Sequence, residues 1–232
     1  MNARVVFSTR QGGVSDGPFE SLNLGLLTGD DRTRVIENRR RLAKQNGIAP
    51  ERVAMGWQVH GDAIHQWSGP DPSLAFMDPA GGHLKVDGHV TSVPGLALLV
   101  LVADCVPVAL VSERRVAMLH CGWRGLAGGI IAKGVEALGT PTRITASVGP
   151  GIGACCYEVG DEVLQAFADY DGVADGRMLN LRAIADAQLR AAGVEHVEHL
   201  DHCTSCRADL YFSHRRDGGV TGRQAGMVWL SE

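Results

Sequence analysis

The sequence has few of the features that mark membrane-spanning, secreted or nucleic-acid-binding proteins. Its longest strictly apolar run, LALLVLVA at 96–103, is far shorter than the roughly 20 residues that cross a bilayer. The first residues, MNARVVFSTRQGG, lack the basic start and apolar core of a signal peptide. Lysine is scarce, with 3 against 19 arginines, and the net charge of −4 argues against binding to a nucleic-acid backbone.

The patterns of cysteine and histidine argue against two more classes of protein. Six cysteines at irregular spacing in 232 residues do not resemble a secreted disulfide framework, so we expect a cytoplasmic protein. A multicopper oxidase needs on the order of ten histidines, several of them in H-x-H pairs. This chain has nine histidines and no H-x-H pair, so copper-dependent polyphenol oxidation is not expected as its main activity.

The composition that is present, 45% apolar and 21% charged residues, is that of an ordinary globular protein. No repeat, low-complexity tract or linker divides the chain, and we expect a single domain over 1–232. The Gly-, Pro- and Ser-rich segment 68–86 predicts a long surface loop. Helices and strands are both expected, which predicts an α/β (α+β) layered sandwich with a mixed β-sheet and flanking helices.

Hydrophobic periodicity and stop signals predict where these elements lie. Helices are expected at 32–46, 123–139, 160–170 and 180–193. Strands are expected at 4–8, 52–59, 96–102, 107–112, 115–120, 143–150, 194–200, 209–213 and 226–230.

Three segments place metal-ligand side chains at the ends of expected elements. His60 precedes a glycine in WQVHG, Cys105 follows a buried strand in VADCVPV, and His120 joins a strand to a helix in LHCGWRG. A His, Cys, His set suits zinc with one position open, the arrangement of a catalytic site. The separations, 45 and 15 residues, are not local zinc spacings. Two alternatives therefore stay open: a buried thiol beside two turn histidines, and a metal-free pair of nucleophile (Cys105) and base (His120).

The segment HVEHLDHCTSC at 196–206 contains the H-x-E and C-x-x-C halves of the zinc nucleobase-deaminase signature. Here only four residues separate Glu198 from Cys203, and His202 stands where that signature has proline. A strand over 194–200 would also turn its two histidines to opposite faces. We therefore do not expect a metal on the histidines and cysteines of this segment, which are His196, His199, His202, Cys203 and Cys206.

Arginines near two expected helices indicate an anion site. The segment STRQGGVSDGPFESLNLG at 8–25 is a glycine-rich loop, but it matches no phosphate-loop pattern. Arg39 lies on the apolar face of the expected helix 32–46, where it needs an anion or a hydrogen-bonding partner. A snorkelling arginine with an acidic neighbour explains that position equally well. Arg124, in the first turn of the expected helix 123–139, is well placed for an anion held at the N-terminus of that helix.

Together these segments resemble the laccase-domain family, also called YfiH-like or polyphenol-oxidase-like, whose members act as purine nucleoside phosphorylases. The fold that this resemblance implies is an α/β/α-type sandwich with a mixed sheet. The resemblance covers nearly the whole chain, in order, through STRQGGVSDGPFESLNLG, GDDRTRVIENRRRL, QVHG, VDGHVT, ADCVPVAL, HCGWRG, GPGIGACCYEVG and CTSCRADLYFSHRRDGGVTGR.

The resemblance also implies roles for individual residues. It implies zinc, with copper less favoured, on His60, Cys105 and His120. The implied catalytic residues are Arg39, Cys105 and His120. The residues expected to bind substrate or phosphate are Arg10, Asn23, Arg124 and Asp87.

One residue of the same motif departs from the family pattern. The usual HAGWRG is here HCGWRG, so Cys121 replaces an alanine beside His120. A thiol next to a ligand residue normally points away from the metal, but one that pointed inward would compete for it.

The activity that the resemblance implies is phosphorolysis of adenosine, inosine, guanosine or methylthioadenosine to the free base and ribose 1-phosphate. Adenosine deamination is a second implied activity, for which zinc would activate water. The expected phosphate clamp is Arg39 with Arg10 or Arg124. Purine nucleosides and phosphate are thus the expected partners, with no nucleic acid and no membrane, and the sequence does not indicate the oligomeric state. The alternatives are a metal-free Cys/His hydrolase or deamidase, an editing hydrolase for cell-wall precursors, and a non-enzymatic partner protein.

Overall fold

The computed structural model describes residues 2–71, 76–77 and 84–231. Within them, one sheet has the strand order β1-β12-β5-β2, a second has the order β11-β8-β6-β7-β4-β3, and β9 pairs with β10. The α-helices are α1 (Arg32–Gln45), α2 (Trp123–Ala127), α3 (Ile130–Leu138), α4 (Asp161–Gln165) and α5 (Leu181–Ala191). The strands are β1 (Ala3–Phe7), β2 (Val53–Ala54), β3 (Ile64–Trp67), β4 (Gly88–Thr91), β5 (Ala97–Val102), β6 (Val106–Val111), β7 (Val116–Cys121), β8 (Thr145–Val148), β9 (Ala174–Asp175), β10 (Met178–Leu179), β11 (His196–His199) and β12 (Gln224–Leu230).

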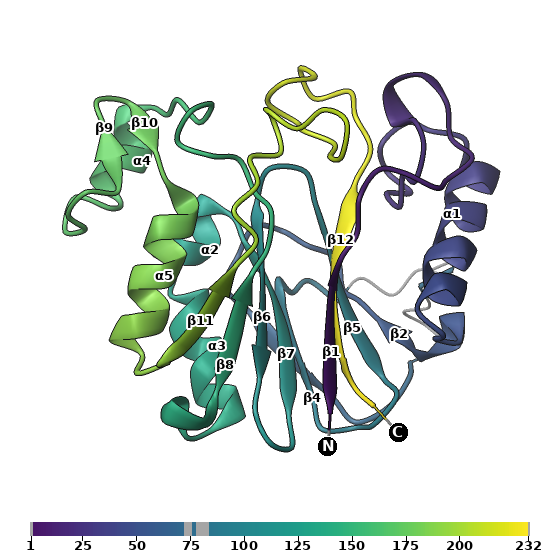
Figure 1. Ribbon diagram of the computed structural model, residues 1–232, viewed down its shortest axis with the longest axis horizontal. Coiled ribbons are helices and arrows are strands. Elements are labelled where there is room, and N and C mark those ends of the chain that lie inside the picture. The colour runs from purple at the N-terminus through teal and green to yellow at the C-terminus, as the bar shows by residue number, and fades with distance from the viewer. Residues whose placement is uncertain (1, 72–75, 78–83, 232) are drawn as a thin grey trace.

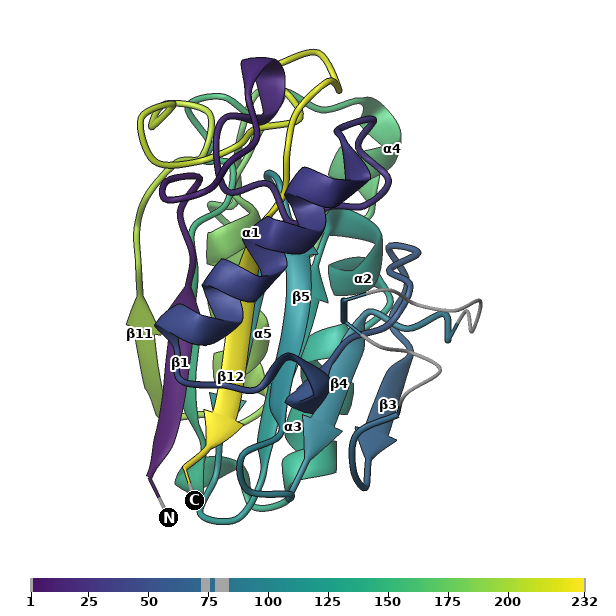
Figure 2. The same cartoon turned by 90° about the vertical axis from the view of Figure 1, so that its right-hand side faces the viewer.

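The two large sheets pack face to face, and helices cover the outer face of each (Figure 1). Helix α1 lies over the sheet that contains β1, β12 and β5, whereas α3 and α5 lie behind the other sheet (Figure 2). Strands β5, β6 and β7 are buried on both faces, which explains why they read as continuous apolar runs. The expected class of layered sandwich is confirmed, but the expected mixed sheet is two mixed sheets, so that the molecule has four layers.

The strand pairing brings several chain ends to one edge of the fold. Strand β7 runs antiparallel to both β4 and β6, so the end of β7 lies beside the starts of β4 and β6. Strand β3 is parallel to β4 and starts at the same edge. In Figure 1 this is the upper edge, and the two chain termini lie together at the lower one.

One expected helix, at 123–139, is two helices. Gly129 has φ 85°, in the left-handed region that glycine adopts most easily, and it separates α2 from α3. A side chain at the preceding Gly128 would meet the carboxylate of Asp62, with its Cβ 2.8 Å from Oδ2. The expected helix at 160–170 is also shorter, because α4 contains only Asp161–Gln165. No described helix has the length and apolar character to span a membrane.

Two expected strands are wrong or shortened because side chains replace the backbone pairing. The segment 209–213 is not a strand: the Gln224 amide accepts from the N–H of Phe212 at 2.9 Å and donates to its carbonyl at 3.2 Å. Of the expected strand 52–59 only Val53–Ala54 forms, and Gln58 bonds in the same two-way manner to the backbone of Leu101. Strands β3 and β4 were not expected, and much of the expected loop 68–86 lies outside the described residues.

Candidate metal centre and substrate cavity

The three residues expected to bind a metal come together at the upper edge of the fold. The ligand atoms of His60, Cys105 and His120 all lie within 4.8 Å of one another, and the two imidazole ring centroids are 4.9 Å apart. His120 is the penultimate residue of β7, Cys105 directly precedes β6, and His60 lies shortly before β3, so the pairing of these strands explains why they meet.

The donor set and the space around it both fit a metal ion. Two imidazoles and one thiolate are three of the ligands that zinc takes, and His60 is exposed, which leaves the cluster open to the solvent side. Gly122 is the neighbour that keeps this space clear. A Cβ at Gly122 would lie 3.1 Å from the Cys105 sulfur and 3.3 Å from the His60 ring.

Asp87 holds two of the three ligand residues in place. It precedes β4 and is fully buried, and its Oδ1 lies 2.7 Å from Nδ1 of His120. Its carboxylate also accepts the backbone N–H groups of residues 59–61, including that of His60 at 2.9 Å. With Nδ1 of His120 occupied, Nε2 is the nitrogen left for a metal, as in many metal-bound histidines. Asp87 was expected to bind substrate, and the structure places its carboxylate against the His120 ring and the backbone of residues 59–61.

The thiol and the imidazole of this cluster influence each other's protonation. Burial favours the neutral thiol of Cys105, but the charges of and hydrogen bonds to His120 and His60 outweigh burial and lower the pKa of Cys105 to about 6. Burial likewise disfavours the charged imidazole of His120, but Cys105 and Asp87 outweigh it and raise the pKa of His120 to about 9. Without a metal the pair therefore favours thiolate and imidazolium, and the thiolate is the form that binds metals.

Two non-glycine residues at this site adopt left-handed backbone conformations. They are His60, with φ 59°, and Asp104, with φ 94°. Such conformations cost on the order of 1 kcal/mol and persist where surrounding contacts fix them. The carboxylate of Asp104 provides such contacts, because it accepts from the Thr204 hydroxyl at 2.6 Å and from the backbone N–H of Arg215 at 2.7 Å. The chain is thereby held in the turn that presents Cys105.

The cluster lies in the wall of a cavity of about 790 Å³, within the range of about 300–1,000 Å³ typical of small-molecule sites. The charge of its lining is strongly asymmetric. Asp104 is the single carboxylate among the described lining residues, whereas five arginines line the cavity: Arg32, Arg39, Arg124, Arg215 and Arg223. Such a cavity is suited to an anionic ligand.

The structure brings two of the three arginines of the expected phosphate clamp to this cavity. Arg39 is buried in α1, donates to the backbone carbonyls of Leu24 and Phe76, and stacks on the Phe76 ring. Arg124 is exposed in α2, with its guanidinium 4.2 Å from the centroid of the Trp123 ring. The inward position expected for Arg39 is confirmed, and within the described residues backbone carbonyls accept hydrogen bonds from its guanidinium.

Two other expected substrate residues lie away from the cavity lining. Arg10 donates to the carbonyls of Glu20 and Ala208, stacks on Phe212, and lines a separate hollow of about 320 Å³. Of the two expected partners of Arg39, the structure therefore brings Arg124 and not Arg10 to the same cavity lining. Asn23 is fully buried, and its side-chain oxygen accepts the backbone N–H of Arg223 at 2.9 Å. Asn23 thus positions the chain beside a cavity arginine instead of facing the cavity itself.

Several cavity residues were not singled out from the sequence, although they lie in quoted motifs. His214, Arg215 and Arg223 come from FSHRRDGGVTGR, and Tyr157 comes from CCYEVG. The Arg215 guanidinium stacks over the Tyr157 ring at 5.1 Å, which ties the two motifs together. The run of basic residues in HRR was the available signal, but it did not distinguish cavity arginines from solvated ones.

The remaining thiols and histidines of the two uncertain motifs have separate environments. Cys121 is fully buried in the core between the six-stranded sheet and its helices, and burial raises its pKa well above that of an ordinary thiol. It belongs to neither described group of potential metal ligands. In the 196–206 segment His199 pairs with Asp186 and His202 with Tyr211, and neither histidine belongs to a described group of potential metal ligands. The cysteines of that segment instead meet Cys155 and Cys156.

Comparison with known proteins identifies relatives along nearly the full chain. A family model described as multi-copper polyphenol oxidoreductase laccase matches residues 4–231. The purine nucleoside phosphorylase YlmD of Geobacillus stearothermophilus is 40% identical over 244 residues, which cover 97% of this chain and 89% of that protein. The purine nucleoside phosphorylase YfiH of Escherichia coli is 36% identical over 96% of this chain and 92% of its own length.

Solved structures show the same architecture. The crystal structure of YlmD from Geobacillus stearothermophilus has a TM-score of 0.92 and 38% identity, and the match covers 99% of this chain and 92% of that one. The crystal structure of the Neisseria meningitidis protein NMB0706 has a TM-score of 0.86 and 34% identity, with coverage of 100% and 95%.

Proposed function

The chain belongs to the multi-copper polyphenol oxidoreductase laccase family, and from this membership and its site we propose that it is a zinc-dependent purine nucleoside phosphorylase. The proposed substrates are a purine nucleoside and phosphate, and the products are the free base and ribose 1-phosphate. Relatives at up to 40% identity carry the name purine nucleoside phosphorylase, which supports the reaction class.

The observation that carries this proposal is the charge of the cavity around the metal-type cluster. Phosphorolysis needs a binding site for phosphate next to the sugar and stabilisation of an oxocarbenium-like transition state. Five arginines against one carboxylate on the described lining supply that anion site. Tyr157 and Trp123 add aromatic surface to the same cavity, which suits a purine ring.

The residues of the chain have distinct parts in this proposal. When zinc is bound, it supplies a Lewis acid beside the substrate. Asp87 fixes the ring of His120 and the loop that carries His60, so both imidazoles are oriented before substrate arrives. Arg124 reaches the cavity from an exposed position and can contact phosphate directly, while Arg39 contributes a fixed positive charge at the wall.

The direct test is to incubate the purified protein with a purine nucleoside, with and without phosphate, and to separate the products by chromatography. We expect free base and ribose 1-phosphate in equal amounts, formed only when phosphate is present. Conversion of adenosine to inosine without phosphate would indicate deamination instead. No turnover of any purine nucleoside by the metal-loaded protein would contradict the proposal.

Substitution of the cavity arginines tests the phosphate site. Arg124→Ala and Arg39→Ala are each expected to raise the KM for phosphate about tenfold or more, because a charge-assisted hydrogen bond contributes about 1.5–3 kcal/mol. The KM for the nucleoside is expected to change less. Arg10→Ala is the matched control, since Arg10 lies outside the cavity lining. An unchanged phosphate KM in both cavity variants would rule out the clamp.

A second candidate function, a metal-free hydrolase or deamidase, is favoured by the proximity of Cys105 and His120. In that case Cys105 would be the nucleophile and His120 its base. Elemental analysis separates the two functions. Stoichiometric zinc at this cluster supports the phosphorylase, whereas activity in fully metal-free protein, lost on alkylation of Cys105, supports the hydrolase.

A further inference from the structure

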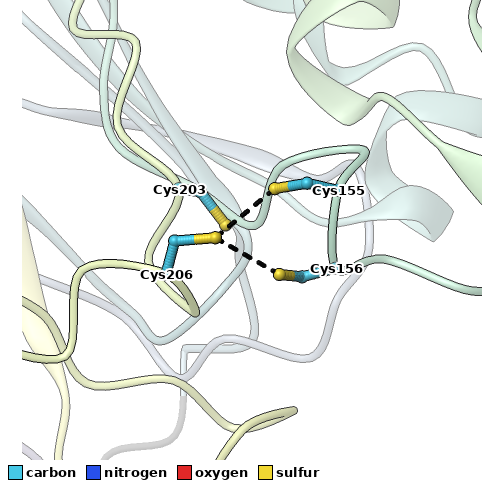
Figure 3. A group of neighbouring side chains, drawn as sticks. All are labelled: Cys155, Cys156, Cys203 and Cys206. Atoms are coloured by element: carbon cyan, nitrogen blue, oxygen red, sulfur yellow. Dashed lines mark hydrogen bonds between the residues drawn. The ribbon is translucent and has the colours of Figure 1, made fainter.

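Four cysteines from two distant loops form a second cluster of potential metal ligands. Cys155 and Cys156 lie in the loop after β8, and Cys203 and Cys206 lie in the loop after β11. Strands β8 and β11 are parallel neighbours, with Val148 opposite His199, so both loops leave the same edge of the sheet. Figure 3 shows the four side chains pointing toward one another from the two loops.

The distances within the cluster match those of one tetrahedral metal ion. The four sulfurs all lie within 4.8 Å of one another, and the Cys206 sulfur is 3.5 Å from the sulfurs of both Cys155 and Cys156. With zinc–sulfur bonds of about 2.3 Å, a tetrahedral site places its sulfurs roughly 3.8 Å apart. All four thiols are unbridged.

We propose that Cys155, Cys156, Cys203 and Cys206 bind a structural zinc ion, separate from the cluster of His60, Cys105 and His120. Four thiolates favour a tetrahedral thiophilic metal and provide no oxygen ligand for a hard cation such as magnesium or calcium. They also fill all four positions around zinc. The site therefore holds the chain together and has no open position for a substrate.

The backbone around the cluster is already arranged for thiolate ligands. The N–H of Gly153 donates to the Cys203 sulfur at 3.2 Å, a hydrogen bond that stabilises a charged sulfur. The two loops also meet through a parallel bridge between Gly151 and Cys203, where the Thr204 N–H donates to the Gly151 carbonyl at 3.1 Å. Arg182 bonds to the carbonyls of Gly151 and His202. The loop positions are thus fixed by contacts that do not depend on the metal.

The site would fix the elements that reach from this edge into the substrate cavity. Ile152 and Tyr157 flank the first cysteine pair and line the cavity. Thr204, next to Cys203, donates its hydroxyl to Asp104, the residue before Cys105. A zinc ion on the four cysteines would therefore clamp both loops at the side of the cavity, and its role is positional.

The decisive experiment measures metal per chain by elemental analysis in protein purified under reducing conditions and reloaded with zinc. Cys105→Ala first removes one ligand of the cluster of His60, Cys105 and His120, so that the remaining zinc reports on the four cysteines alone. We expect one zinc per chain in Cys105→Ala and none when Cys155→Ser and Cys206→Ser are added. Cys121→Ala, which removes a cysteine outside both clusters, is the matched control and should keep the full zinc content.

A second measurement keeps all four cysteines of the cluster and so does not depend on how the Cys155→Ser and Cys206→Ser variants fold. Cobalt replaces zinc in the Cys105→Ala protein, and the intensity of its sulfur-to-cobalt charge-transfer absorption reports the number of thiolate ligands. Four thiolates are expected, together with protection of four cysteines from alkylation until a chelator is added. Absence of bound zinc in Cys105→Ala, stoichiometric iron instead of zinc, or a disulfide between these cysteines in the reduced protein would overturn the proposal. None of these results would bear on the phosphorylase, which is tested by turnover.

Discussion

The two cysteine-containing clusters of this chain differ in donor type, exposure and surroundings. The first combines two imidazoles with one thiol, includes the fully buried Asp87 behind its ligands, and faces a cavity rich in arginine. The second consists of four thiols in two surface loops, and Cys155 and Cys206 are exposed. Three ligands leave a position for chemistry, whereas four close the site.

With the two proposed assignments, the ligand set distinguishes a catalytic site from a structural one at the same edge of the fold. Both clusters lie where strands end, which is the part of the chain least constrained by sheet pairing. At the first, strain and buried charge are concentrated around Cys105, as expected of a site that does chemistry. At the second, ordinary loop hydrogen bonds hold unstrained cysteines, as expected of a site that only stabilises.

The strongest test of the contrast is Cys105→Ala. We expect kcat/KM for phosphorolysis to fall by more than about 100-fold. Removal of a residue that only orients a metal ligand typically lowers activity by about 10–100-fold, so a larger loss indicates a ligand or a catalytic group. The melting temperature should change little, because Cys105 is only partly buried and lies in a loop. Steady-state kinetics and thermal denaturation on the same preparation measure both. A variant with near-normal turnover would show that the first cluster is not the catalytic one.

Asp87→Asn is expected to have the next largest effect. Asparagine keeps the size of the side chain and one acceptor oxygen, but it lacks the negative charge of Asp87. In the wild-type protein that charged carboxylate contacts the His120 ring and accepts three backbone N–H groups. Loss of such an orienting partner typically lowers metal affinity or activity by about 10–100-fold. Competition with a chelator measures zinc affinity, and kcat/KM measures activity. Unaltered affinity with lowered activity would mean that Asp87 acts on substrate after all.

Thr204→Val tests whether the second loop supports the first site. The substitution preserves shape but removes the hydroxyl that donates to Asp104 at 2.6 Å, a bond to a charged group contributing about 1.5–3 kcal/mol. We expect a lower melting temperature and a loss of about three- to tenfold in kcat/KM, as the turn before Cys105 loosens. Wild-type kinetics in this variant would mean that the loop contact contributes to stability alone.

Cys206→Ser is expected to have the smallest effect on catalysis. It removes a thiol remote from the reacting groups, so kcat/KM should stay within about threefold of the wild-type value. The corresponding change in activation free energy is below the roughly 1.4 kcal/mol that a tenfold change represents. The expected loss is in thermal stability and in resistance of the 149–160 and 200–207 loops to proteolysis, because a structural metal contributes its binding free energy to folding. A variant that is inactive yet fully stable would reverse the roles assigned to the two clusters.

The sequence predicts best those features that depend on local pattern. The apolar runs of β5, β6 and β7 and the amphipathic pattern of α1 and α5 were all correctly interpreted, since burial on both faces or on one face leaves a direct trace. The helix at 123–139 was not, because a glycine inside a helical pattern is common and the sequence does not show that Gly129 adopts the left-handed φ of 85° that divides the helix. The strand at 209–213 failed because the Gln224 side chain competes for its backbone.

The same division holds for the candidate sites. The ends of strands predicted where His60, Cys105 and His120 would lie, and the structure brings all three together. The contact of Asp87 with His120 could not be predicted, because it depends on how β4 pairs with β7. The four-cysteine cluster joins two short cysteine pairs that are distant in the sequence, with Cys155 and Cys206 51 positions apart. Its spacing therefore carried no local signal. The position of Arg10 outside the large cavity could not be predicted either, since it depends on contacts of its guanidinium with distant backbone carbonyls and with Phe212.

The left-handed conformation of Asp104 sets a limit on how this protein could be engineered. Glycine adopts that backbone without strain, so replacing Asp104 would be a natural choice in a search for heat-resistant variants. The substitution would relieve the backbone strain in the turn, but it would also remove the carboxylate that accepts hydrogen bonds from the Thr204 hydroxyl and the Arg215 backbone N–H. Thermostability programmes should leave Asp104 unchanged and turn to positions away from the upper edge. At Asp104 a strained backbone conformation accompanies the contacts that fix the turn before the Cys105 thiol.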